Sequence, residues 1–190
     1  MAGYFSERTF TQHDLSDGVL PSGEYESCRF YNCDLSNVKL SELKFITCEF
    51  ISCNVSLASL HKTSFQDIKF QGCKMLGLHF EHCNAFGLAF SFQDCVLNHS
   101  SFYGLKIKKT VFQNCQLQEV DLTDCDLSLS VFDECDLKGA MFENTVLEKC
   151  DFRKAYNYSI NPEINRLKKA RFSLPEVVGL LVQYDVVIER

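Results

Sequence analysis

Residues 119–136 read EVDLTDCDLSLSVFDECD, and a large apolar residue returns at every fifth position. Leu122, Leu127 and Phe132 lie in the stretch, and Leu137 follows it at the same spacing. A helix turns about 100° per residue and would spread these side chains around its axis, whereas a strand would send alternate ones to opposite faces. The five-residue period therefore predicts a coiling backbone with corners, which keeps all of these side chains inside.

The same period runs through almost the whole chain. It holds from position 5 to position 90, shifts by two residues near 90–92, and resumes from position 92 to position 152. It fails at 157 and 162 but returns in phase at 167 and 172. We therefore predict one solenoid domain over residues 1–172. The shift predicts a bulge or kink, which is either an inserted pair of corner residues or a functional site.

The cysteines share one phase of the repeat, because each lies two residues before an apolar repeat position. They are Cys28, Cys33, Cys48, Cys53, Cys73, Cys83, Cys95, Cys115, Cys125, Cys135 and Cys150. None shows the C-x2-C spacing typical of a metal site, and the five histidines are dispersed. The pattern predicts small inward-facing side chains and no metal site. Free thiols in this number favour a reducing compartment, which predicts a cytoplasmic protein.

The C-terminal segment departs from the repeat. Ser173 precedes Glu176 at the spacing of a capping box, and Pro175 would lie in the first turn. The apolar stripe consists of Leu174, Val177, Val178, Leu181 and Tyr184. We predict a short amphipathic helix over 173–184, followed by a brief strand at 186–188, together forming a terminal unit over 173–190. The stripe either caps the end of the solenoid or forms a homodimer interface.

Several segments resemble the repeat of the pentapeptide repeat proteins, A-(D/N)-L-x-x. They are CDLSN (33–37), CDLSL (125–129), CDLKG (135–139) and AMFEN (140–144). The resemblance covers roughly residues 5–172. It implies an all-β solenoid, namely a right-handed quadrilateral β-helix of pentapeptide repeats with four repeats per coil.

Within that family the arrangement resembles the Qnr-type proteins. The likeness lies in CRFYNCDL (28–35), FGLAF (86–90), DCVL (94–97), NPEIN (161–165) and LPEVVGLL (174–181). Qnr-type proteins protect DNA gyrase and topoisomerase IV from quinolones and are similar in shape and charge to a DNA duplex. Their C-terminal helix joins two rods end to end, which implies a homodimer here. They also carry two protruding loops, whereas this chain has only the two-residue shift near Ser91.

Negative charge is concentrated in residues 113–152. This segment contains Glu119, Asp121, Asp124, Asp126, Asp133, Glu134, Asp136, Glu143, Glu148 and Asp151, against only Lys138 and Lys149, while the whole chain has a net charge of −6. All ten acids occupy outward phases of the repeat, so we predict an acidic belt around the rod. Such a belt suits a protein groove that normally holds DNA phosphates. The alternative is that these residues only keep the rod soluble.

Two function hypotheses follow. The first is a DNA mimic that binds DNA gyrase or topoisomerase IV through the belt and modulates or protects these enzymes; the second is a structural or signalling scaffold that binds another protein. No catalytic motif or cofactor-binding pattern is present, so we predict neither enzymatic activity nor a cofactor. We also predict no membrane span, because no apolar run approaches about 20 residues. Lys106, Lys108 and Lys109 and the basic tail at 166–171 predict solvated surface rather than direct nucleic-acid binding.

Overall fold

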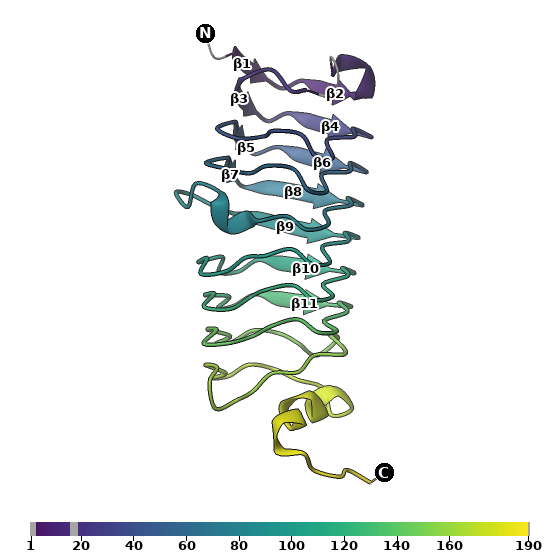
Figure 1. Ribbon diagram of the computed structural model, residues 1–190, viewed down its shortest axis with the longest axis vertical. Coiled ribbons are helices and arrows are strands. Elements are labelled where there is room, and N and C mark those ends of the chain that lie inside the picture. The colour runs from purple at the N-terminus through teal and green to yellow at the C-terminus, as the bar shows by residue number, and fades with distance from the viewer. Residues whose placement is uncertain (1–2, 16–18, 190) are drawn as a thin grey trace.

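The computed structural model describes residues 3–15 and 19–189, and it is a parallel β-solenoid shaped as an elongated rod (Figure 1). Successive coils stack with a 20-residue offset, so that Phe30 lies beside Phe50. One sheet has the order β1 (Gly3–Ser6), β3 (Gly23–Glu26), β5 (Lys44–Ile46) and β7 (Ser64–Gln66). The other has the order β11 (Val131–Asp133), β10 (Val111–Gln113), β9 (Phe90–Gln93), β8 (Ile68–Gln71), β6 (Glu49–Ile51), β4 (Arg29–Tyr31) and β2 (Thr9–Thr11). All pairs are parallel, which confirms the predicted all-β solenoid.

The rod has four faces, which the chain visits in the same order in every coil. Face 1 carries β1, β3, β5 and β7 and continues as the bridge column Lys106–Asp126–Val146–Arg166. Face 2 carries the seven-stranded sheet and continues through 151 and 171. Single bridges form face 3, at 34, 54, 74, 96, 116, 136 and 156, and face 4, at 39 and 59 and then at 79, 101, 121 and 141. Because faces 4 and 1 are consecutive along the chain, they meet at one edge of the rod.

Aromatic rings stack in columns behind the faces. The column behind face 2 runs without a gap through Phe10, Phe30, Phe50, Phe70, Phe92, Phe112, Phe132, Phe152 and Phe172. Neighbouring rings are nearly parallel, with centroids 4.5–5.4 Å apart. The five-residue period thus has a direct cause: each repeat supplies one ring or aliphatic side chain to a filled interior.

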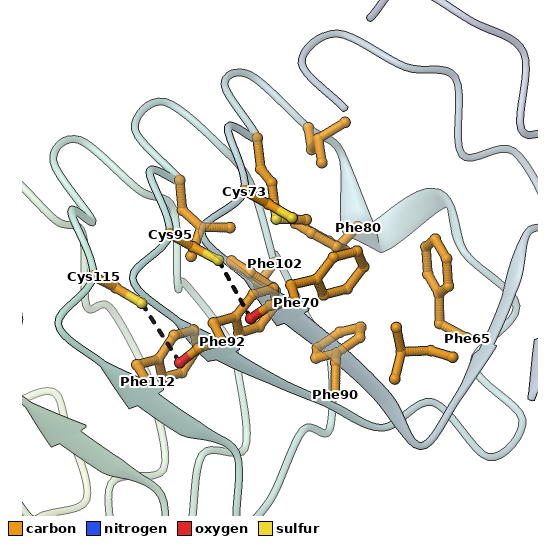
Figure 2. Packing of buried hydrophobic residues seen from close by; sticks show 14 of the residues in the cluster. Phe65, Phe70, Cys73, Phe80, Phe90, Phe92, Cys95, Phe102, Phe112 and Cys115 are labelled. Carbon is orange, nitrogen blue, oxygen red and sulfur yellow. Dashed lines mark hydrogen bonds between the residues drawn. The ribbon is translucent and has the colours of Figure 1, made fainter. Parts of the chain in front are cut away.

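All eleven cysteines are free and buried inside this rod. The Sγ of Cys95 donates to the carbonyl of Phe70, and that of Cys115 donates to the carbonyl of Phe92, which belongs to the preceding coil (Figure 2). Thr145 Oγ1 donates to the carbonyl of Leu122 from the same phase of the repeat. At this phase a cysteine or threonine therefore fills the interior and also donates to a carbonyl of the preceding coil.

The two extra residues of the chain lie in the segment 84–89, on face 1. Strand pairing across this coil is offset by 22 residues, with Phe70 beside Phe92. The segment leaves and rejoins the coil through hydrogen bonds from the Asn84 and Ala89 amides to β7 and the residue preceding it. It forms the loop that projects from the rod in Figure 1, just after the 3₁₀ helix η2 (Phe80–His82). Phe86 at its tip is 79% exposed, whereas Phe90 fills the interior.

The predicted C-terminal helix and strand are wrong in their form. The segment contains two 3₁₀ helices, η3 (Glu176–Leu180) and η4 (Val182–Tyr184). Another 3₁₀ helix, η1 (Gln12–Asp14), lies near the N-terminal end of the rod. Pro175 occupies the N-cap position of η3, and no side chain caps this helix. Gly179 packs against the Tyr158 backbone, where a Cβ would lie 2.2 Å from the carbonyl oxygen, and its own carbonyl accepts from Ile160. Docking on the last coil thus overrides the helical period.

Residues 186–188 form no strand because no described strand lies beside them to complete a ladder. All three side chains are exposed, with Val187 at 89%. Within residues 3–15 and 19–189, no helix has the length and apolar character that a membrane crossing requires.

Candidate interaction faces

The predicted acidic belt is spread over all four faces of the rod. Asp126 and Glu148 lie on face 1; Asp133, Glu134 and Asp151 on face 2; Glu119 and Asp136 on face 3; and Asp121, Asp124 and Glu143 on face 4. This grouping follows from the 20-residue offset. The faces differ, however, in what surrounds each carboxylate.

Four of these carboxylates support the backbone locally. Asp121, Asp126, Asp136 and Asp151 each accept a hydrogen bond from the amide two residues further along the chain. Each forms an Asx turn directly before a corner of the coil. The aspartate that precedes the apolar residue therefore has a structural role, whatever its electrostatic role.

Basic side chains neutralise half of the belt. Asp126 pairs with Lys108 at 3.0 Å, Glu148 with Arg166 at 2.7 Å, and Asp151 with Arg153 at 2.7 Å. Lys154 bridges Asp133 at 3.0 Å and Glu134 at 3.5 Å. Glu119 faces His99 at 3.2 Å.

The pKa values of two carboxyls in these ion pairs, those of Asp151 and Asp126, are lowered. The pKa of Asp151 lies below its ordinary value chiefly because Arg153 donates hydrogen bonds to the carboxylate. Partial burial would raise the pKa of Asp126, but hydrogen bonds from Ser128 and Lys108 outweigh it, and the pKa is lowered. Both carboxylates are charged at neutral pH, but each already binds a basic side chain of the same chain.

On face 4 none of the belt residues has a basic partner within the described structure. Its segments 100–104, 120–124 and 140–144 contain no lysine or arginine, and neither Asp121, Asp124 nor Glu143 forms an ion pair. Tyr103 and Met141 lie on the same face and are 50% and 46% exposed. The hydrogen bond to Asp124 raises the pKa of the Tyr103 phenol. Face 4 is thus an acidic surface with apolar side chains between the charges.

Face 1 has the opposite charge in the same part of the rod. Its segments 105–109, 125–129, 145–149 and 165–169 contain Lys106, Lys108, Lys109, Lys149, Arg166, Lys168 and Lys169, against Asp126 and Glu148. The belt is therefore interrupted along one side. The prediction of solvated surface for the lysines near 106 and for the basic tail did not place them on one face. The signal was available, since the two clusters lie 60 residues apart, which is three offsets of 20.

The C-terminal end of the rod carries an apolar groove of about 920 Å³. Its lining includes Leu174, Val178 and Leu181 from the predicted interface, together with Val182, Val186 and Ile188. Leu174 is 89% exposed, and Tyr184 bonds to Glu163 of the preceding coil at 3.0 Å. Val177 is only partly exposed. The end surface is therefore apolar, although it is not an α-helix.

The thiols and histidines form no ligand cluster in the described part of the chain. His79 and His82 stack with ring centroids 5.3 Å apart, and His79 bonds to Glu81 at 2.9 Å. The polar groups that remain available to a partner are those of the outer faces. The outer faces can therefore bind a partner through their charged side chains.

A family profile described as a pentapeptide repeat region matches residues 24–91 and 88–156. No curated protein sequence matches the chain significantly.

Among solved structures, a trypsin-treated variant of QnrB1, a plasmid-mediated fluoroquinolone resistance protein, aligns with a TM-score of 0.49 at 18% identity, covering 99% of this chain and 98% of that one. Full-length QnrB1 aligns with a TM-score of 0.47 at 17% identity, covering 97% and 98%. HetL, a pentapeptide repeat protein involved in heterocyst differentiation regulation from Nostoc sp. strain PCC 7120, aligns at 0.47 and 13% identity, covering 90% and 84%. At these values the likeness says nothing about the partner of this chain.

Proposed function

Because this chain belongs to the pentapeptide repeat family, we propose that it is a DNA-mimicking protein that binds DNA gyrase or topoisomerase IV and modulates them or protects them from quinolones. The observation that carries the proposal is the unpaired acidic surface of face 4. The role is one of binding, and the buried free thiols suit the reducing cytoplasm in which we place it.

Face 4 supplies what a DNA-binding groove recognises. Asp121, Asp124 and Glu143 present negative charge on a rigid backbone, so little conformational entropy is lost when a basic groove closes on them. Tyr103 and Met141 add apolar contact between the charges. The carboxylates on the other faces contribute less, because intramolecular lysines and arginines already neutralise many of them.

Neutralising face 4 tests the proposal. In the variant Asp121→Asn, Asp124→Asn, Glu143→Gln, we expect affinity for DNA gyrase to fall on the order of 10- to 100-fold, because three charge contacts are lost. The asparagine introduced by Asp121→Asn retains an oxygen that can accept the Thr123 amide, so the turn is preserved. The measurement is titration into gyrase, followed by complex formation and by supercoiling with and without a quinolone.

The matched control neutralises three carboxylates that lie outside face 4 and form no ion pair with a basic side chain, namely Glu7→Gln, Asp67→Asn and Asp94→Asn. The change in net charge is the same, so affinity should stay within about twofold of the unmodified chain. Equal loss in both variants would mean that only total charge matters. Absence of any complex, inhibition or rescue would end the topoisomerase proposal.

The second candidate function is a scaffold for another protein. It is favoured by face 1, because a DNA duplex is negative on every side and this rod is not. If gyrase and topoisomerase IV do not bind, a partner that uses both the acidic and the basic face becomes the better explanation.

We also propose that the chain forms a homodimer through its C-terminal end. Leu181 is 39% exposed in the apolar groove, and a carboxylate there would have to be desolvated in the interface. We expect Leu181→Asp to elute as a 21.8 kDa monomer in size-exclusion chromatography with light scattering, and the unmodified chain at about twice that mass. Leu129→Asp, at an exposed site on face 1, should remain dimeric. An unchanged mass for Leu181→Asp would contradict the interface.

A further inference from the structure

Two basic segments far apart in the sequence lie on one face of the rod. Residues 105–109 and 165–169 each place three bases on face 1, and three coil spacings separate them. At about 4.8 Å per coil, the separation is about 14 Å along the rod. Lys149 lies between the two segments. We call this set of side chains the basic strip: Lys106, Lys108, Lys109, Lys149, Arg166, Lys168 and Lys169. Asp126 and Glu148 lie between the two segments on the same face.

Most of the strip has no intramolecular counter-charge. Lys108 pairs with Asp126 and Arg166 pairs with Glu148, whereas no carboxylate of the described chain lies within ion-pair distance of the other five. All seven side chains are exposed. A surface of closely spaced like charges costs free energy unless an anionic partner occupies it.

Part of the strip is also ordered as a straight line. Lys109, Lys149 and Lys169 occupy the same corner in three of four successive coils, with φ of 62°, 60° and 62°. Only Leu129 interrupts this column, at φ 69°. Because the stacked coils hold the backbone, the lysines keep fixed positions along the rod, two coils and then one coil apart, which suits a partner that carries a line of negative charges.

The exposed aromatic residue of the projecting loop lies on the same face. Residues 84–89, which form the projecting loop in Figure 1, belong to the coil between β7 and residues 105–109. Phe86 therefore lies one coil before the N-terminal end of the strip. Its ring is 79% exposed. An aromatic platform beside a line of lysines is the combination that binds single-stranded nucleic acid, since the bases stack while the phosphates meet the cations.

We propose that the basic strip and Phe86 form a binding site for single-stranded nucleic acid. The strip spans about 14 Å along the rod, which is long enough to contact a few successive phosphates of one strand. The backbone of the strand lies along the lysine column, and a base at one end stacks on Phe86. A flexible strand can follow a flat face over this length, whereas a duplex presents a convex surface and touches fewer of the lysines. The site is independent of face 4 and of the topoisomerase proposal.

The test is fluorescence anisotropy of a labelled single strand of about 20 nucleotides, titrated with the full chain at several salt concentrations. In the variant Lys109→Gln, Lys149→Gln, Lys169→Gln, we expect at least a tenfold loss of affinity at low salt. The slope of log K against log salt should fall by about 2, since each phosphate contact to a single strand contributes about 0.7. Phe86→Ala should weaken binding and leave the slope unchanged.

The matched control is Lys39→Gln, Lys62→Gln, Lys74→Gln, which removes three exposed lysines of faces 3 and 4 with the same change of charge. Its affinity should stay within about twofold of the unmodified chain. No binding at low salt, an equal loss in the control, or equal affinity for a duplex of the same length would each overturn the proposal. Gyrase is absent from the assay, so failure here leaves the proposed function of face 4 untouched.

Discussion

Replacing Phe112 by alanine is expected to lower the free energy of unfolding by about 3–5 kcal/mol. The ring is fully buried and stacks on Phe92 at 5.2 Å and on Phe132 at 5.0 Å, with interplanar angles of 8° and 7°. Truncation to alanine removes both stacking contacts and leaves a void in the middle of the column of rings behind face 2. The neighbouring rings cannot move to fill it, because strands on both sides fix their backbones.

Urea unfolding followed by circular dichroism measures this loss. Phe112→Leu is the first control, because leucine occupies the same phase at Leu117 and Leu122; it should cost less than half as much as the alanine variant. Phe86→Ala is the second, because an exposed ring contributes little, and its stability should stay within about 0.5 kcal/mol of the unmodified chain. The denaturant slope must be compared too, since a void in a stacked array can uncouple its two halves. Equal effects of Phe112→Ala and Phe86→Ala would contradict the packing.

The interior of the rod could be predicted from sequence because it depends on a local rule. Every coil repeats the same backbone path, so the five-residue spacing alone indicates that the side chains of Leu122 and Phe132 point inward. The cysteines share one phase because that position faces a carbonyl of the preceding coil, as Cys115 faces Phe92. The alternation between Cys, Thr and Ser was therefore readable as one structural slot, although the hydrogen bond itself was not.

The C-terminal segment could not be predicted in the same way. Ser173 and Glu176 have the spacing of a helix start, yet the backbone follows the contact of Gly179 with Tyr158 instead. That contact depends on the shape of the last coil, which no local pattern encodes. Short segments without a repeat are governed by where they dock.

The outer surface lies between these extremes. The face of each charged residue follows from the 20-residue offset, but its partner depends on side-chain reach. Lys154 reaches back to both Asp133 and Glu134, and this pairing removes them from the free acidic surface. The spacing alone could not tell which acids lack a basic partner, as Asp121, Asp124 and Glu143 of face 4 do.

Raising the pH above about 9 is expected to destabilise the fold steeply. Burial raises the pKa of the Cys83, Cys125 and Cys150 thiols to about 12, because the thiolate would have to lie in the apolar interior. In the unfolded chain a cysteine has a pKa of about 8.5, so below that pH the thiols are neutral in both states and stability does not depend on them. Above it the unfolded chain releases protons that the folded chain retains. Each thiol then lowers the free energy of unfolding by about 1.4 kcal/mol per pH unit until the pH approaches its folded pKa.

These three thiols together predict a loss of about 4 kcal/mol per pH unit between about pH 9 and pH 11, which approaches the whole stability of an ordinary domain within two units. Urea midpoints measured under reducing conditions should be flat from about pH 6 to pH 8 and fall steeply above about pH 9.

Serine does not titrate in this range and can donate to the same carbonyls, as Ser100 does to Met75 at 2.8 Å. The variant Cys125→Ser, Cys150→Ser should therefore reduce the alkaline slope by about 2.7 kcal/mol per pH unit, whatever its stability at neutral pH. An equal slope in both proteins would mean that other groups, such as the buried Tyr158, whose pKa burial also raises to about 12, govern alkaline unfolding instead.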